Sequence, residues 1–142
     1  MAVGKTYAPV TYAVGREKVR EYARAVGEKN PLYLDVEAAR AAGHADVVAP
    51  PMFAAVYGAP AITPGMVDPE LGIDFSRVVH GAQEFVWGPL VVAGDEIVST
   101  ATVKDISKRG GMSFYAFEVV SDNQRGETVC TATWTTIVRG AS

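Results

Sequence analysis

The segment AVGEKNPLY, residues 25–33, holds the side chains of this chain that are best suited to acid–base chemistry. Glu28 offers a carboxylate, and Tyr33 offers a phenol. A tyrosine ordinarily titrates near pH ~10 and is a poor base at neutral pH, whereas histidine, at ~6.5, suits that role. Glu28 is therefore either a substitute acid or a solvated residue beside a helix end, and Tyr33 is expected to pack or to line a tunnel. Asn30 could hold a carboxylate or a substrate, but asparagine before proline is also an ordinary turn choice.

The two histidines and the single cysteine are the other candidates for chemistry. His44 is either a replacement base or a capping or surface residue, and His80 lies in a predicted strand, where we expect a hydrogen bond to a loop. Neither histidine has a carboxylate or cysteine at metal-ligand spacing, so no metal site and no cofactor is predicted. Cys130 alternates with Ala132 and Trp134 on one face of a predicted strand, which favours a buried packing thiol.

The composition limits the kinds of protein that could carry these residues. The 142 residues suffice for one domain, expected to span residues 1–142, and are too few for two. The net charge of -3 and the pI near 5.3 argue against nucleic-acid binding. The single cysteine excludes an internal disulfide, and neither a signal peptide nor a membrane-spanning run is evident. We therefore expect a cytoplasmic protein without a membrane segment.

Two short helices are predicted on either side of the acid–base segment, after a short strand at residues 7–14. The first helix is amphipathic, because apolar residues recur at i, i+3, i+4 and i+7. These residues are Val19, Tyr22, Ala23 and Val26. Gly27 stands where a helix end favours a left-handed residue, and Pro31 opposes continuation. Asp35 can cap the second helix, in VEAARAAG at residues 36–43. The acid–base segment is thus the turn between them.

The rest of the chain predicts one buried helix followed by strands. The helix, PPMFAAVYGAPAI at residues 50–62, begins with prolines, which a first turn tolerates, and is apolar on every side. Four segments rich in Val, Thr and aromatic residues follow, at residues 77–87, 96–106, 112–122 and 127–138. Four consecutive antiparallel strands wrapped around a central helix predict an α+β fold with the hot-dog architecture. Its exposed edge favours at least a dimer.

Three blocks in order carry a resemblance to a known family: YAVGREKVREYARAVGEKNPLY, GHADVVAPPMF and HGAQEFVWGPLVVAGDEI. They resemble the MaoC-like hydratases and dehydratases, and more closely the FAS1-like dehydratase branch, over nearly the whole chain. The resemblance implies a single hot-dog domain and substrates that are acyl thioesters of coenzyme A or acyl carrier protein. Active members add or remove water across C2 and C3, so a role in fatty-acid or polyketide-type metabolism is implied.

The chain departs from the active members of that family at the catalytic positions. Their turn resembles G-D-x-N-P-[aliphatic]-H, in which Asp and His form the acid/base pair. Glu28 stands at the aspartate position and Tyr33 at the histidine position. The positions that match are Gly27, Asn30, Pro31 and Leu32. Active relatives also have A-H-G-M at the helix entrance, where the glycine N–H is thought to face the thioester oxygen. Here residues 49–52 are A-P-P-M, and proline has no N–H.

These departures imply that the chain alone is inactive as a dehydratase. The combination resembles the non-catalytic subunits of heterodimeric (R)-3-hydroxyacyl-ACP dehydratases, whose MaoC-like partner carries Asp and His while the other subunit shapes the acyl tunnel. The resemblance therefore implies a MaoC-like partner, or otherwise a homodimer. The residues expected to contact the substrate are Asn30, Tyr33, Pro51, Met52, Phe53 and Tyr57.

Other interpretations stay open. The residues of the buried helix that would face an acyl chain, Met52, Phe53, Val56 and Tyr57, are equally expected in the core, because a tunnel would be cut through the same apolar layer. The chain could instead be a homodimeric acyl-thioester hydratase or thioesterase, although residues 50–63 hold no Asp or Glu for the helix carboxylate that hot-dog thioesterases often use. A non-catalytic acyl-thioester-binding module is the third possibility.

Overall fold

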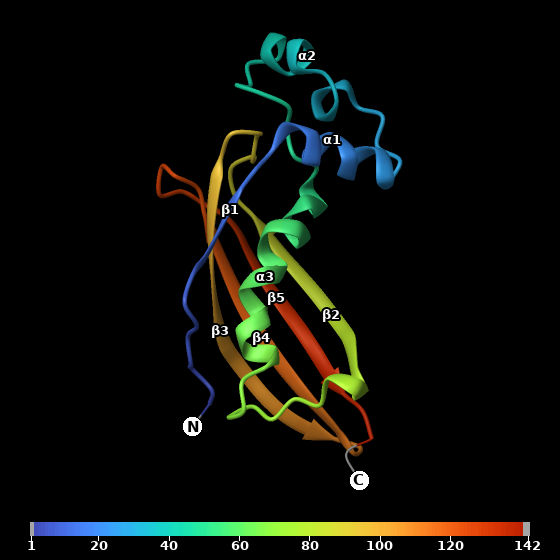
Figure 1. The fold of residues 1–142 in the computed structure, drawn as a ribbon, viewed down its shortest axis with the longest axis vertical. Helices are drawn as coiled ribbons and strands as arrows, with labels where there is room; N and C mark the ends of the chain where they lie inside the picture. The colour runs from blue at the N-terminus through green and yellow to red at the C-terminus, as the bar shows by residue number, and fades with distance from the viewer. Residues whose placement is uncertain (1, 141–142) are drawn as a thin grey trace.

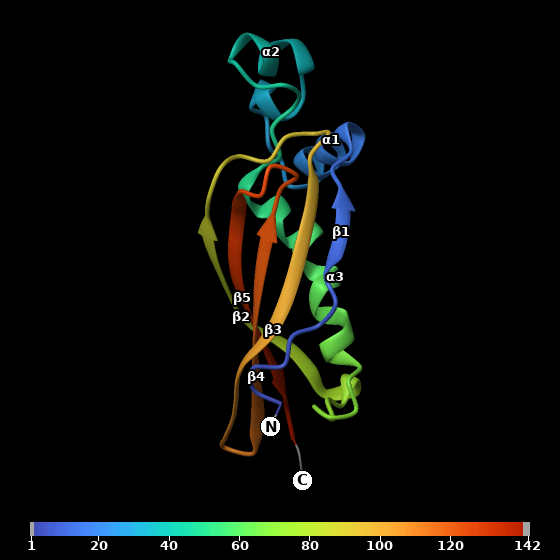
Figure 2. The same cartoon turned by 90° about the vertical axis from the view of Figure 1, so that its left-hand side faces the viewer.

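The computed structural model describes residues 2–140 as one antiparallel sheet with a long helix against one face (Figures 1 and 2). The strands are β1 (Val10–Ala13), β2 (Val78–Trp87), β3 (Glu96–Arg109), β4 (Met112–Asp122) and β5 (Thr128–Val138). The helices are α1 (Arg16–Ala25), α2 (Val36–Ala41) and α3 (Ala54–Met66), with the 3-10 helices η1 (Pro31–Tyr33), η2 (Pro51–Phe53) and η3 (Phe75–Arg77). None of the helices within residues 2–140 has the length and apolar character needed to cross a membrane. The predicted α+β arrangement is confirmed.

The strands follow the order β1-β3-β4-β5-β2, and all neighbours are antiparallel. The last three strands in the chain form the predicted hairpins. The expectation that β2 joins this run beside β3 was wrong, because β2 pairs with β5 at the other edge of the sheet. Residues 88–95 do not close a hairpin but cross to the far strand, and on the way the Val91 carbonyl accepts the Ala49 N–H at 2.8 Å. One edge of β2 therefore pairs with no described strand.

Helix α3 lies along the inner face of the sheet, over β1, β3 and β4 (Figure 1). Small residues allow this close packing: a Cβ on Gly65 would lie 2.5 Å from Cε1 of Phe117, whereas a Cβ on Gly58 would meet nothing closer than 3.9 Å. The α-helix begins later than predicted, because the proline-rich first turn forms η2. Met52 in that turn is 50% exposed, so its expected place in the core was wrong; Phe53 and Tyr57 are buried as predicted.

Helices α1 and α2 extend beyond one end of the sheet, with η1 between them (Figures 1 and 2). The amphipathic character of α1 is confirmed, since its apolar side packs inward with Val19 and Ala23 fully buried. Gly27 and Gly43 follow the two helices with φ of 78° and 97°, conformations that glycine adopts without strain. Asp35 caps α2 as predicted, because its side chain accepts a hydrogen bond from the Glu37 N–H at 2.9 Å.

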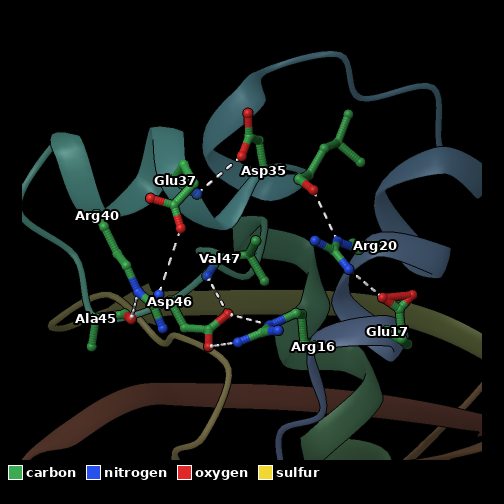
Figure 3. A network of polar contacts seen from close by, with 10 residues as sticks. Arg16, Glu17, Arg20, Asp35, Glu37, Arg40, Ala45, Asp46 and Val47 are labelled. Atoms are coloured by element: carbon green, nitrogen blue, oxygen red, sulfur yellow. Dashed lines mark hydrogen bonds and ion pairs between the residues drawn. The ribbon is translucent and has the colours of Figure 1, made fainter.

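A polar network fixes α1 against the segment that leads into α3 (Figure 3). Arg16 donates from Nε and Nη2 to the two carboxylate oxygens of Asp46, at 3.0 and 2.8 Å. Asp46 also accepts the Val47 N–H at 2.8 Å, and the Arg16 guanidinium is the main reason why the pKa of Asp46 is lowered. Further along α1, Arg20 donates to the Leu34 carbonyl at 2.9 Å. The end of η1 is thereby held to α1.

A second polar cluster ties the N-terminal segment to the loop after α3. The Tyr7 hydroxyl donates to Asp68 Oδ2 at 2.7 Å. Lys5 Nζ lies 2.7 Å from the same oxygen and 2.8 Å from Glu70 Oε1. The hydrogen bond from Lys5, followed by that from Tyr7, lowers the pKa of Asp68 to about 2. Burial is the main cause that raises the pKa of Tyr7 to about 12.

Candidate functional site

Hydrogen bonds hold the backbone of the turn at residues 27–33, whereas its three candidate side chains differ in their exposure and in their contacts. The Glu28 N–H donates to the Ala23 carbonyl at 2.8 Å and closes α1, while the Glu28 side chain is exposed. Asn30 Oδ1 accepts the Leu32 N–H at 3.0 Å and caps η1. Tyr33 is partly buried. Asn30 thus acts as a turn residue, with its amide oxygen already engaged inside the turn, and its contact with a substrate stays a prediction.

The entrance to α3 offers few backbone donors. Pro50 and Pro51 have no N–H. The Ala49 N–H donates to the Val91 carbonyl and the Phe53 N–H to the Pro50 carbonyl, both at 2.8 Å. An oxyanion at a helix N-terminus is normally stabilised by several free N–H groups. The sequence A-P-P-M and these two bonds leave this entrance poorer in donors than an ordinary helix start.

An apolar cavity of about 60 Å³ lies beside this entrance. Residues 49–51 form one wall, and residues 87–91, from the last residue of β2 onward, form another. Tyr57 and Val129 complete the lining. We call this space the apolar cavity. Of the residues expected to contact a substrate, it brings together Pro51 and Tyr57. Its apolar lining suits an alkyl group rather than a charged one.

The other candidate residues do not line the apolar cavity. They are Glu28, Asn30, Tyr33, His44, Met52 and Phe53. Phe53 is fully buried and meets Tyr22 and Tyr12 edge-on, with ring centroids 5.5 and 6.1 Å away. Contact between these residues and a substrate stays a prediction. His80 also differs from expectation, because its Nε2 lies 2.9 Å from the Ala82 carbonyl within β2 and not at a loop.

Sequence reasoning missed the cavity residues that follow β2. Trp87 ends β2, and Leu90 and Val91 lie in the crossing that follows. Trp87 and Leu90 are large, apolar and exposed, and both line the apolar cavity. The sequence offered one signal, the apolar residues on either side of Gly88–Pro89. These apolar residues can be interpreted as a cavity wall only once residues 88–95 are known to lie against residues 49–51.

Tyr57 supplies the polar group of the apolar cavity. It is buried, and its hydroxyl lies next to the Cys130 thiol. Burial, followed by the neighbouring thiol, raises the pKa of Tyr57 well above its ordinary value, and burial raises the pKa of Cys130. Both groups are therefore protonated at neutral pH, so that Tyr57 can donate a hydrogen bond but cannot serve as a base. The predicted burial of Cys130 is confirmed.

The comparison with known families rests on nearly the whole chain. A family model described as "FAS1-like, dehydratase domain region" matches residues 1–132. The chain belongs to the FAS1-like dehydratase family. Its relatives include a UPF0336 protein of Clavibacter michiganensis, 51% identical over 133 residues that make up 94% of this chain and 89% of the relative.

Solved structures share the fold of this FAS1-like dehydratase domain. A chain of the C-terminally truncated HadBC (3R-hydroxyacyl-ACP dehydratase) complex from Mycobacterium tuberculosis matches with a TM-score of 0.85 and 28% identity, over 96% of this chain and 97% of that one. A MaoC-like dehydratase matches with a TM-score of 0.86 and 31% identity, over 99% of this chain but 43% of that longer chain. The predicted hot-dog fold and the MaoC-like and FAS1-like resemblance are confirmed.

Proposed function

We propose that this FAS1-like dehydratase chain is the supporting subunit of a 3-hydroxyacyl-thioester dehydratase, in which a MaoC-like hot-dog partner carries the catalytic aspartate and histidine. The observation that carries the proposal is the turn of residues 27–33, which keeps its backbone scaffold while Glu28 and Tyr33 occupy the catalytic positions. The likeness to the HadBC complex supports a heterodimeric assembly. The substrate would be an acyl-CoA or acyl-ACP in fatty-acid or polyketide-type metabolism.

The chemistry of dehydration explains why a partner is needed. A base must remove the proton at C2, an acid must protonate the leaving hydroxyl at C3, and a donor must stabilise the enolate oxygen of the thioester. Glu28 could supply at most one of these groups, and a tyrosine such as Tyr33 is a weak base near neutral pH. Pro50 and Pro51 remove donors from the helix entrance. The chain alone therefore lacks a complete catalytic set.

The free edge of β2 is the surface on which we place the partner. β2 pairs with β5 on one side, and its other edge bonds no described strand, so its outward N–H and C=O groups are open to a further strand. Val86 is 62% exposed and Trp87 48% exposed on this strand. A hot-dog partner whose own edge strand joins in the antiparallel sense would continue the sheet and cover these side chains.

The apolar cavity supports a role in forming the acyl site. Trp87 belongs both to its lining and to the free-edge strand, so a partner bound along β2 would close the open side of the cavity. Enlarged in this way, the cavity would receive part of the acyl chain, and the protonated hydroxyl of Tyr57 could donate to a substrate oxygen.

Hydration of a trans-2-enoyl-CoA tests the proposal directly. The purified chain is assayed alone and mixed with a MaoC-like subunit that retains Asp and His. We expect turnover in the mixture well above that of either subunit, and Glu28→Gln in this chain should leave the turnover unchanged. A copurified complex with no gain in turnover would contradict the supporting role. Activity of the chain alone that Glu28→Gln abolishes would favour the stand-alone enzyme instead.

A further inference from the structure

A second hollow lies near the turn that joins β3 to β4, away from the apolar cavity and without a part in the proposed function. It has a volume of about 520 Å³, and its lining includes Asp74, Arg77, Lys108, Ser113, Tyr115 and Val138. An adjoining hollow of about 320 Å³ shares Lys108 and Ser113 and adds Arg109. We call the two together the basic hollow. It lies between this turn and the loop that follows α3.

The register of the strands brings the polar groups of the basic hollow together. Lys108 on β3 is paired directly with Ser113 on β4, which in turn is paired with Val138 on β5. Val78 on β2 continues this row and comes directly after Arg77. Directly opposed residues of antiparallel strands have Cβ atoms about 4.5–5.5 Å apart. Lys108 and Ser113 are therefore immediate neighbours, and Arg77 lies at the other end of the row.

Ser113 is a buried polar residue whose hydroxyl is not used by the chain. The residue is 7% exposed, yet its Oγ makes no hydrogen bond with any other residue in the range 2–140. Tyr115, two residues further along β4, differs because its hydroxyl donates to the Leu71 carbonyl at 3.0 Å. The Ser113 oxygen is reached from the hollow, because it is not among the buried side-chain atoms of this range that lack a partner. The Ser113 hydroxyl is thus free to donate to a group that enters the hollow.

The charges of the basic hollow favour an anion. Arg77 Nε lies 3.5 Å from the Asp74 carboxylate, so the negative charge in the lining is compensated. Lys108 and Arg109 form no ion pair with any carboxylate among residues 2–140. The uncompensated charge is positive, although the chain as a whole carries -3.

We propose that the basic hollow binds a phosphate group. One phosphate can accept hydrogen bonds from the Lys108 ammonium and the Ser113 hydroxyl together, while the nearby arginines balance its charge. The phosphate belongs either to a thioester carrier such as coenzyme A or to free inorganic phosphate. The assignment of coenzyme A as the source of the phosphate rests on the proposed function, whereas the phosphate site itself does not. Binding is measured on the chain alone, so its failure is distinguishable from failure of the dehydratase assay.

Calorimetric titration of the purified chain with coenzyme A, pantetheine and inorganic phosphate tests this site. Lys108→Gln and Ser113→Ala remove the two donors. Lys104→Gln is the matched control, because Lys104 is on the same strand, lies 3.8 Å from Glu118 and does not line the hollow. We expect coenzyme A to bind, Lys108→Gln to weaken its binding about tenfold or more, and Lys104→Gln to have little effect. Binding should also weaken as salt is raised.

The three ligands separate the possible sources of the phosphate. Pantetheine lacks the phosphates of coenzyme A and should bind more weakly at this site. Inorganic phosphate that binds as tightly as coenzyme A, with the same loss in Lys108→Gln, would identify free phosphate as the occupant. Equal binding of pantetheine and coenzyme A would overturn the proposal, as would wild-type affinity for coenzyme A and for inorganic phosphate in both Lys108→Gln and Ser113→Ala.

Discussion

The side-chain oxygen of Asn30 accepts a hydrogen bond from the backbone N–H of Leu32 at 3.0 Å, which makes Asn30 the cap of η1. Replacing it in Asn30→Ala is expected to lower the free energy of unfolding by about 1 kcal/mol, as loss of an N-cap does. Asn30→Asp keeps an acceptor and serves as the control. Urea denaturation measures both variants. Wild-type stability of Asn30→Ala would show that the cap is dispensable.

The packing of α3 on the sheet predicts opposite effects for two glycine substitutions in one helix. In Gly65→Ala the new Cβ would lie 2.5 Å from the buried ring of Phe117, and we expect a loss of about 1–3 kcal/mol in stability. In Gly58→Ala the nearest atom is 3.9 Å away, so the better helix propensity of alanine should leave stability unchanged or raise it by up to about 1 kcal/mol. Thermal denaturation compares the pair, and equal effects would mean that α3 can move away from β4.

The cluster around Asp68 predicts a dependence of stability on acid. The pKa of Asp68 in the folded chain is about 2, below its ordinary value of 3.8. A carboxylate whose pKa is lower in the folded chain than in the unfolded chain stabilises the fold. This stabilisation is fully present above the pKa of the unfolded chain and is lost as the pH falls from about 4 to about 2. Asp68→Asn should therefore flatten the decline in unfolding free energy over this range. Asp105→Asn, which lies outside the cluster, should retain the wild-type decline; identical profiles for all three proteins would refute this assignment.

The free edge of β2 predicts where a charge would prevent assembly. Val86→Lys places an ammonium on the exposed strand and should weaken association with a MaoC-like partner by about tenfold or more, since lysine on an edge strand opposes strand addition. Val98→Lys is the control, because Val98 is also exposed but lies on β3, which pairs on both sides. Sedimentation velocity of the mixtures measures assembly. A Val86→Lys chain that still assembles normally would exclude this edge as the interface.

Much of the fold followed from local patterns in the sequence, because each depends on residues close together in the chain. The spacing of apolar residues in α1, the glycine after each short helix and the cap at Asp35 are examples. The position of β2 did not follow, because which of two strands it pairs with depends on the path of residues 88–95 and not on β2 itself. Met52 was misplaced for a related reason: the prolines before it form a 3-10 turn that leaves its side chain outside.

The candidate site was less predictable than the fold. Residues 27–33 could be recognised as a turn from a motif within one segment, and Pro51 and Tyr57, which the sequence singled out, both line the apolar cavity. The apolar cavity, however, is formed by three segments that are distant in the sequence. Trp87 and Leu90 could not be assigned to it before the tertiary contacts between these segments were known. The basic hollow is similar, since Lys108 and Ser113 become neighbours through the register of a hairpin, and Arg77 through the return of β2 to β5.

The strand order also sets the sequence of events during synthesis. β2 leaves the ribosome well before β5, its only described neighbour, so it must wait unpaired until residues 128–138 have emerged. Pairings between residues as distant as Gln83 and Trp134 slow folding and leave the unpaired strand β2 open to aggregation in the meantime. A partner that adds to β2 can recognise a finished edge only after β5 is in place, so the pairing of β2 with β5 comes before assembly.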